Sequence, residues 1–381
     1  MPKQVQHDDD TMLAKHLNPN LFKNPELIPT RNGYGDGLVE AGTKNKNVVV
    51  LCCDLVESTR SLGFAKKFPE RFIEMGVAEQ NMAGVAAGMA GYGKVPFIAS
   101  YAVFSPGRNF DQIRVSIAYG DQNVKIAAAH AGISVGPDGA THQALEDIAM
   151  MRALPNMILL SPCDMLETKK ATLTAAAYKG PVYLRFTREK TPVITTPKTP
   201  FEIGKAQVLR TGKDVTIVAT GPLVYEALLA AECLAGNKDA IATLFARYPK
   251  IAARVKTSKL HGHSMARSKV TIAWSPAKIS ALLKQRGPVD AEVINCSTIK
   301  PLDVETLVRS AKKTGLVITV EEHQIHGGLR GAVAEALSLL HPTRIIPVGM
   351  PDSFGESGET MELLEKYGMT APWIIYTLVN Q

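Results

Sequence analysis

Short apolar runs alternate with stretches of helical periodicity along almost the whole chain. Continuous apolar, β-branched runs predict strands buried on both faces. These runs are Val48–Leu51, Phe97–Ser100, Val124–His130, Met157–Ser161, Val182–Phe186, Val215–Thr220, Glu292–Cys296 and Leu316–Glu321. Helical spacing of apolar residues lies between them, as in Tyr34–Gly42, Ala78–Ala90 and Gly328–Leu340. This alternation predicts an α/β fold in which mainly parallel sheets are covered by helices.

The length of 381 residues predicts two domains rather than one core. The segment Thr191–Lys205 has three prolines and few large apolar residues, which is typical of a linker. We therefore expect an arm at 1–30, a first domain at 31–193, a linker at 194–205 and a second domain at 206–381. The start of the chain is polar, so we interpret it as a poorly ordered arm and not as a signal peptide.

Residues 236–288 interrupt the second domain with a basic segment. They contain eleven Lys/Arg and one Asp, a local charge of +10, which leaves −3 for the rest of a chain whose net charge is +7. This distribution argues against nucleic-acid binding by the body of the protein and predicts a surface insertion. Binding of RNA or an acidic partner by the insertion is the alternative. His261 and His263 have no other ligand type nearby, so a metal site is not predicted there.

The chain lacks the features of a membrane or disulfide-rich protein. No run of about 18 apolar residues exists, which predicts no membrane span. The five cysteines are scattered without CxxC spacing, which favours reduced thiols in a cytoplasmic protein.

One candidate for chemistry is Glu79, in the segment Met75–Met82. It stands at the predicted start of a helix on which small residues recur, a pattern that lets another backbone approach closely. The alternative is that Glu79 is a first-turn acid favoured by the helix dipole.

A second candidate is the glycine-rich loop His130–Gln143, which follows an apolar strand. Loops at the carboxyl ends of parallel strands are where α/β proteins bind ligands. His130, His142 and Asp138 have no apolar packing role there, so we expect a ligand-binding loop. The alternative is a turn whose histidines face solvent.

Four motifs together resemble those of transketolase, and more narrowly those of the C-terminal subunit of split, two-chain transketolases. They are Gly76–Asn81 (GVAEQN), Asp138–Gln143 (DGATHQ), Asp54–Thr59 and Val320–His323. The resemblance covers Arg31 to the end except the basic insertion. It implies a pyrimidine-binding domain followed by a transketolase C-terminal domain. It also implies transfer of a two-carbon ketol unit between sugar phosphates, in the non-oxidative pentose phosphate pathway.

The resemblance implies thiamine diphosphate as cofactor and assigns residues to its aminopyrimidine. Glu79 matches the glutamate that shares a proton with N1′, which promotes the imino tautomer that deprotonates the thiazolium carbon. Tyr101 and Phe104 match two aromatic residues that stack on the ring. Gly107 falls near the place of a third, for which Phe110 is the possible substitute.

The resemblance also implies a phosphate-binding set. Arg31, Ser58, His130 and Arg188 match the residues that hold the terminal phosphate of the sugar. Clustered arginines suit a phosphate dianion because each guanidinium donates charge-assisted hydrogen bonds.

Three further residues match substrate or cofactor contacts. His142 matches a histidine near the C1 hydroxyl and carbonyl of the donor, and Asp138 an aspartate that contacts a substrate hydroxyl. Asp54 matches an aspartate that lines the cofactor site. Glu79, His130 and His142 are thus the candidate catalytic residues.

The magnesium and diphosphate half of the site is missing from the sequence. No GDG is followed by an asparagine 25–30 residues later, and Gly35–Gly37 lies in a predicted helix without it. We therefore expect Mg²⁺ ligands from a partner, the N-terminal transketolase subunit that carries GDG…N, in an α2β2 assembly. Glu321, Glu322 and His323 are candidates for an interface, and the C-terminal domain is expected to be structural and dimer-building.

Three other functions stay open at this point. The β subunit of a 2-oxo-acid dehydrogenase has the same architecture and glutamate but needs no phosphate set. Deoxyxylulose-phosphate synthase has a different phosphate pattern. A non-catalytic paralogue that uses the basic insertion would not need Glu79, His130 and Asp138 together.

Overall fold

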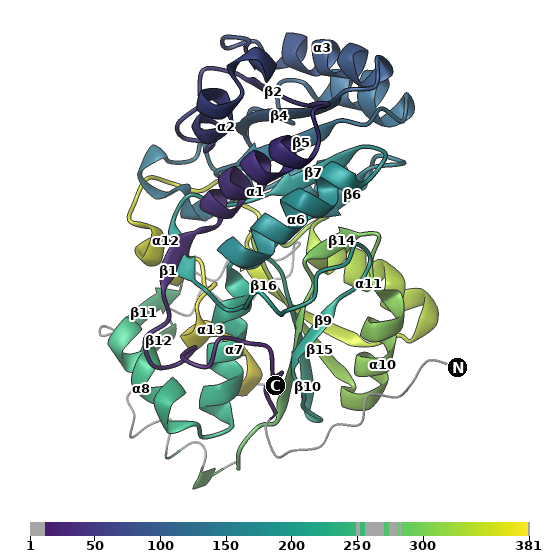
Figure 1. Ribbon diagram of the computed structural model, residues 1–381. Coiled ribbons are helices and arrows are strands. Elements are labelled where there is room, and N and C mark those ends of the chain that lie inside the picture. Colours follow the sequence, from purple (N-terminus) through teal and green to yellow (C-terminus); the bar gives the residue numbers. More distant parts are fainter. Residues whose placement is uncertain are drawn as a thin grey trace.

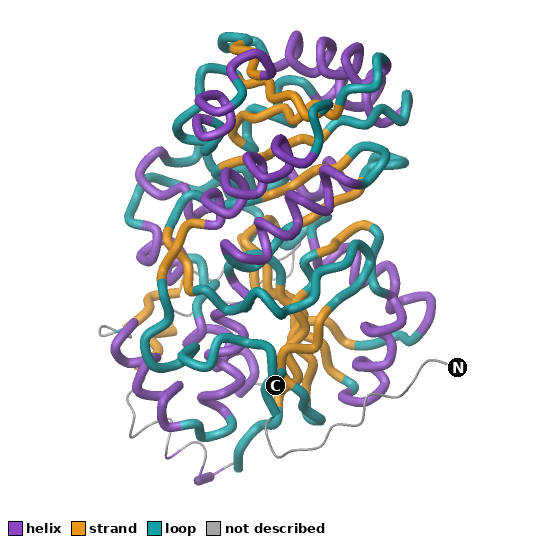
Figure 2. Tube along the Cα trace, in the orientation of Figure 1, coloured by secondary structure: helices purple, strands orange, loops and turns teal. Residues whose placement is uncertain are grey.

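A computed structural model describes residues 12–248, 252–255, 270–273, 281, 284–285 and 287–379. It contains two large sheets, each with helices on both faces, one above the other in Figure 1, and two short two-stranded pairs. Figure 2 shows the same division, with strands inside and helices outside in both parts. The predicted two-domain α/β class is confirmed.

The first sheet has seven strands, and all neighbours but one are parallel. From edge to edge they are β14 (Thr298–Lys300), β6 (Ile158–Leu160), β7 (Val182–Arg185), β5 (Lys125–Ala129), β4 (Val95–Tyr101), β2 (Val48–Cys52) and β3 (Phe72–Glu74). β14 is antiparallel to β6 and comes from the second half of the chain. The two short edge strands, β14 and β3, were not predicted, because each has three residues that include a charged one and so lacks a continuous apolar run.

Helices cover both faces of this sheet. On one face lie α1 (Thr30–Lys44), α2 (Leu62–Lys67) and α6 (Met165–Ala177). On the other lie α3 (Glu79–Gly91), α4 (Phe110–Gln112), the following π-helical turn Ile113–Tyr119 and α5 (Asp147–Arg152).

Helix α1 contains Gly35–Gly37, and its glycines serve close packing. A Cβ at Gly37 would lie 2.8 Å from the Thr172 side chain on α6, and one at Gly35 would lie 2.9 Å from the backbone oxygen of Arg60. These contacts agree with the prediction that this GDG lies within a helix.

The second sheet has five strands and is likewise mainly parallel. Its order is β16 (Arg344–Met350), β15 (Leu316–Gln324), β10 (Val215–Ala219), β13 (Ala291–Asn295) and β9 (Gln207–Arg210), with β9 antiparallel to β13. Its helices are α7 (Leu223–Leu234), α8 (Lys238–Arg247), α10 (Val304–Thr314), α11 (Leu329–Leu340), α12 (Thr360–Lys366) and α13 (Ala371–Val379). Every residue of α7 is buried, because α8 and α13 cover it.

The basic segment 236–288 is described only in part. Within it, α8 is a helix, and β11 (Ala252–Val255) pairs with β12 (Val270–Ala273) as an antiparallel hairpin. His261 and His263, for which no metal site was predicted, lie outside the described residues.

The described part of the N-terminal arm, residues 12–30, packs against the rest of the protein, so the prediction of a poorly ordered arm was wrong for these residues. Leu17, Leu21 and Phe22 are buried in the core of the second domain beside α7. The chain then enters β1 (Leu27–Pro29), which pairs with β8 (Lys190–Pro192). Leu13, Leu17 and Leu21 are four positions apart, and the polar residues between them conceal this apolar stripe.

The linker is bound to the first domain by the carboxylate of Asp164 and by Lys170, which donates to the Thr196 and Thr199 carbonyls. Asp164 is fully buried, and its oxygens accept hydrogen bonds from the backbone amides of Ile194 and Thr195 at 2.8 and 2.5 Å. The same side chain caps α6 by accepting from the amide of Glu167. The segment between the domains is therefore held in place by hydrogen bonds, although its composition is that of a flexible linker.

Two further expectations concern the chain as a whole. Among the described residues no helix combines the length and apolar character that crossing a membrane requires. All five cysteines are buried with free thiols.

We predict that Asp164→Ala lowers the free energy of unfolding by about 3 kcal/mol, because it leaves several buried amides without an acceptor and removes a helix cap. Urea unfolding followed by circular dichroism measures this. Asp239→Ala, at an exposed aspartate, is the control and should change stability by less than about 0.5 kcal/mol. Equal effects of the two substitutions would contradict the role given to Asp164.

Candidate active site

The candidate site lies where four neighbouring parallel strands of the first sheet end. β7, β5, β4 and β2 are adjacent, so their carboxyl ends share one edge. Arg188, His130, Tyr101 and Asp54 stand at or just beyond these ends. Residues far apart in sequence thus meet at the place where α/β proteins bind ligands.

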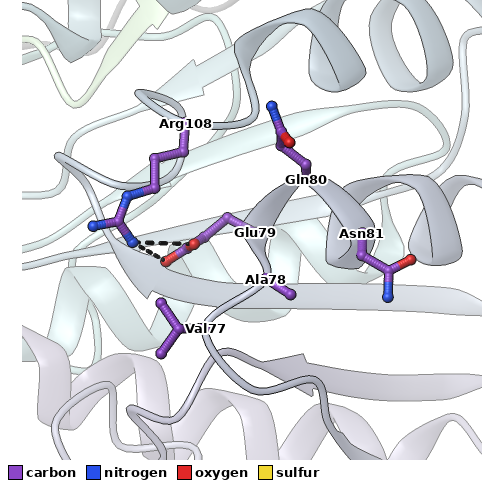
Figure 3. Close-up of a pocket in the computed structure, with 6 residues that line it drawn as sticks. All are labelled: Val77, Ala78, Glu79, Gln80, Asn81 and Arg108. Atoms are coloured by element: carbon purple, nitrogen blue, oxygen red, sulfur yellow. Dashed lines mark hydrogen bonds and ion pairs between the residues drawn. The ribbon is translucent and has the colours of Figure 1, made fainter.

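Glu79 begins α3 and is 3% exposed. Its carboxylate accepts a hydrogen bond from Ser100 at 3.2 Å and two from Nη1 of Arg108 at 3.2 and 3.3 Å. Figure 3 shows this pair beside a hollow of about 440 Å³ lined by Val77–Asn81 and Arg108. A buried carboxylate thus opens onto a concave surface.

Arg108 is a site residue that the sequence analysis missed. Its side chain is 48% exposed, and its guanidinium lies 4.1 Å from the centre of the Phe104 ring. A buried carboxylate needs a charged or hydrogen-bonding partner, and an arginine between Phe104 and the next helix would have been the candidate.

Four rings form one cluster at the ends of β4 and β5. Tyr101 and Phe104 are stacked with centroids 5.8 Å apart, and Tyr101 lies 4.1 Å from the His130 ring. His142 meets the edge of Phe104 at 5.3 Å. The structure therefore brings the two predicted aromatic residues together with both predicted histidines.

The structure leaves no room for an aromatic side chain at Gly107, near the predicted place of a third stacking residue. A Cβ at Gly107 would lie 2.1 Å from the backbone oxygen of Val103. Phe110, the possible substitute, packs with the apolar cluster between α3 and the sheet. The Arg108 guanidinium, and not a third aromatic side chain, packs on the Phe104 ring.

Arg31 links Ser58 and His130 through one nitrogen. Its Nη1 donates to the Ser58 carbonyl at 3.0 Å and to Nε2 of His130 at 3.1 Å. Burial, together with the charges of Arg60 and Arg188, lowers the pKa of the Arg31 guanidinium.

His130 is neutral and carries its proton on Nδ1, because Nε2 accepts from Arg31. Burial, then the charges of Arg31 and Arg188, lower the pKa of His130 to about 3. Its Nδ1 and the Nε of Arg31 are buried without a hydrogen-bond partner. Buried polar atoms left unpaired are exceptional, and here two of them adjoin the ring cluster.

Arg188 is held by Asp138 from the glycine-rich loop. Its Nη1 lies 3.1 and 3.2 Å from the two carboxylate oxygens of Asp138. Both side chains are about one-third exposed, which leaves the guanidinium accessible from solvent. Arg188, which was predicted to bind the phosphate, is therefore paired with Asp138, which was predicted to contact a substrate hydroxyl.

Arg60 is a third arginine near His130 that the sequence analysis did not identify. It has a left-handed φ of 67°, and its Nε donates to the side chain of Asn32, the neighbour of Arg31, at 3.0 Å. Its charge contributes to the lowered pKa values of Arg31 and His130. Arg60 thus adds a positive charge to this edge of the sheet, beyond those of the predicted phosphate-binding residues.

Asp54 is exposed at the end of β2 and adopts a φ of 57°. Its amide donates to Glu74 at 2.7 Å, and the same Glu74 oxygen accepts from the amide of Gly76 at 3.0 Å. Glu74 therefore ties the Asp54 turn to the segment that leads into Glu79.

Glu321, Glu322 and His323 were candidates for an interface, and the structure buries all three within the chain. They lie on β15, and Arg185 of β7 donates to the Glu322 carbonyl at 2.8 Å. Glu322 and His323 thus contact the first domain of the same chain, whereas Glu321 accepts from the amides of Leu329 and Arg330 at the start of α11.

We predict that His130 makes folding stability depend on pH. Its ordinary pKa is 6.5 and the folded value is about 3, so between these values the unfolded chain binds a proton that the folded chain does not. The contribution is fully present above pH 6.5 and is lost as the pH falls, by about 1 kcal/mol per unit. Wild type should therefore lose more stability than His130→Asn between pH 6.5 and 4 in urea titrations. Parallel curves would contradict the neutral, buried state.

The sequence matches two family profiles over most of its length. "Transketolase, pyrimidine binding domain" matches residues 26–193, and "Transketolase, C-terminal domain" matches residues 204–245 and 277–374. The gap in the second match falls inside the predicted basic insertion.

Similar proteins cover nearly the whole chain. A putative transketolase C-terminal section of Methanocaldococcus jannaschii is 42% identical over 92% of this chain and 95% of that protein. The 6-deoxy-6-sulfo-D-fructose transketolase subunit SqwH of a Clostridium species is 37% identical over 91% and 92%. A solved split-gene transketolase, described as an inactive beta4 tetramer, is 42% identical with a TM-score of 0.74 and coverage of 93% and 97%. This chain is therefore a member of the transketolase family of ketol-group transferases, and it carries the pyrimidine-binding and C-terminal domains of that family.

Proposed function

We propose that this chain is one subunit of a two-chain transketolase that moves a two-carbon ketol unit from a ketose phosphate to an aldose phosphate. The observation that carries the proposal is that Glu79, the ring cluster and the arginines all lie on one edge of one sheet. The ring cluster stands between the carboxylate and the arginines, since Phe104 contacts Arg108 on one side and Tyr101 contacts His130 on the other. A cofactor and an anionic substrate would thus be bound side by side.

The residues present fit the pyrimidine half of thiamine diphosphate. Glu79 offers a buried carboxylate at the edge of the hollow, and Tyr101 and Phe104 offer flat faces. When bound, the cofactor supplies the carbon nucleophile that adds to the ketose carbonyl. Glu79 would hold a proton at N1′ of the ring, for which Arg108 must release one carboxylate oxygen. Tyr101, Phe104 and Arg108 would orient the ring and exclude water from it.

The remaining half of the site is proposed to come from a second chain, the N-terminal subunit. Val77 is 69% exposed on the rim of the hollow, and a Cβ at Gly84 or Gly88 on α3 would meet nothing within 4 Å. This open, small-residue surface next to Glu79 offers room for a partner backbone. The partner would supply the Mg²⁺ ligands and diphosphate contacts, with α2β2 as the assembly we favour.

Sugar phosphates of the pentose phosphate pathway are the proposed substrates. The cluster of Arg31, Arg60 and Arg188 around His130 suits a phosphate group. A 2-oxo-acid dehydrogenase β subunit handles substrates without that group and would not need the cluster. The Clostridium relative is named for a sulfonated sugar, which makes the terminal anion the point to test.

We predict that ketol transfer from xylulose 5-phosphate appears only when the chain is mixed with its N-terminal subunit, thiamine diphosphate and Mg²⁺. Glu79→Ala should lower kcat by at least about 10²-fold, because it removes the group that holds the N1′ proton. Size-exclusion chromatography should show unchanged assembly. Glu40→Ala, at a surface carboxylate on α1, should retain full activity. Full activity of the chain alone, or of Glu79→Ala, would rule out the proposal.

We predict that Arg188→Ala lowers kcat/KM for a phosphorylated ketose by about 10- to 100-fold, since a charged hydrogen bond contributes about 1.5–3 kcal/mol. The same variant should use an unphosphorylated ketose as well as the wild type does. Arg309→Ala on α10 is the control for loss of an exposed arginine. Equal losses on both sugars would show that Arg188 acts on something other than the phosphate.

A further inference from the structure

The three glycines of the loop between His130 and Gln143 all face the second domain. A Cβ at Gly132 would lie 2.3 Å from a carboxylate oxygen of Glu322, and one at Gly139 would lie 2.4 Å from the hydroxyl of Ser357. A Cβ at Gly136 would lie 3.0 Å from the hydroxyl of Thr360. The glycines therefore admit side chains of the second domain against this loop.

Hydrogen bonds fix the loop in that position from both sides of Ser134. Its amide donates to Oε1 of Glu322 at 2.5 Å, and its carbonyl accepts from the hydroxyl of Thr360 at 2.9 Å. Gln143, at the far end of the loop, donates to the Glu356 carbonyl at 2.9 Å. Two separate segments of the second domain thus hold a loop of the first.

Glu322 is itself rigidly placed. It is 2% exposed on β15, and its carbonyl accepts from Arg185, which forms a buried ion pair with Asp147 at 2.9 Å. Tyr183 donates to the same Asp147 oxygen at 2.8 Å. The backbone of the residue whose carboxylate binds Ser134 is therefore anchored to a buried polar network, where small displacements are resisted.

We propose that Glu322, with the segment Gly355–Thr360, positions the loop that carries Asp138 and His142 toward the substrate. The side of the loop that faces the second domain is buried, whereas Asp138 stays exposed and pairs with Arg188. The second domain is then a determinant of substrate binding, in addition to a structural unit. The part of this inference that concerns substrate rests on the proposed function, whereas the part that concerns loop order does not.

Hydrogen–deuterium exchange of the isolated chain tests the loop directly. Glu322→Ala should raise exchange in residues 132–143 by about tenfold or more, because it removes a charge-assisted hydrogen bond. Glu322→Gln, which keeps an acceptor oxygen, should restore most of the protection. Thr360→Val, of nearly the same shape, should raise exchange by a smaller factor and covers the case in which Glu322→Ala does not fold.

Glu232→Ala is the matched control. Glu232 is also a buried carboxylate of the second domain, but it pairs with Arg210 at 2.8 Å. This variant should leave exchange in residues 132–143 unchanged. Unchanged exchange in both Glu322→Ala and Thr360→Val, or an equal rise in Glu232→Ala, would overturn the inference.

Kinetics with the N-terminal subunit test the consequence for substrate. Glu322→Ala should lower kcat/KM for the ketose phosphate by about 10- to 100-fold, as expected for a misplaced binding loop, and Glu322→Gln should recover it. Thiamine diphosphate affinity should change by a smaller factor than kcat/KM, since Glu79, Tyr101 and Phe104 lie outside the loop. Loss of loop protection with normal kcat/KM would overturn the positioning role. If wild type shows no ketol transfer, the proposed function fails, while the exchange experiment still decides the loop's dependence on Glu322.

Discussion

The candidate site depends on one geometric constraint, the meeting of four parallel strand ends at a single sheet edge. Neighbouring strands in a sheet lie about 4.8 Å apart, so residues just after β7, β5, β4 and β2 must share a small region. This is why Arg31, Ser58 and His130, which are up to 99 positions apart in sequence, are joined by one guanidinium. Altered strand order would separate them even if every motif were kept.

The positive charge of this sheet edge follows from the close approach of residues at the four strand ends. Arg31, Arg60 and Arg188 surround His130, and a protonated imidazole would add a fourth positive charge to a buried position. The ring is therefore neutral and serves as a hydrogen-bond acceptor. Two carboxylates, Glu79 and Asp138, each hold one arginine. A ligand that binds here must redirect arginines that already have partners, so binding and local rearrangement are coupled.

A continuous apolar run is a local signal, so the sequence was sufficient for the strands buried on both faces, and it placed Glu79 at the start of a helix, where the structure has it. The sequence was insufficient wherever the role of a residue depends on a contact with a distant part of the chain. The glycines of the His130–Gln143 loop suggested a ligand-binding turn, yet each makes room for a side chain of the second domain. Arg108 and Arg60 carry no local pattern, and only the positions of Glu79 and Arg31 give them a role. The apolar stripe of the arm is too short to be recognised without the core that it enters.

The chain crosses between its two domains more often than its domain order suggests. Residues 12–22 lie against the second domain before the first begins, and β14 leaves the second domain to complete the first sheet. A first domain produced alone would therefore expose the backbone of β6 as an open sheet edge, which is a template for aggregation. It would also lack the partners of Arg185 and Ser134. We therefore expect the two domains to express and fold only as a single unit. Each domain produced alone would self-associate, so its catalytic properties could not be measured.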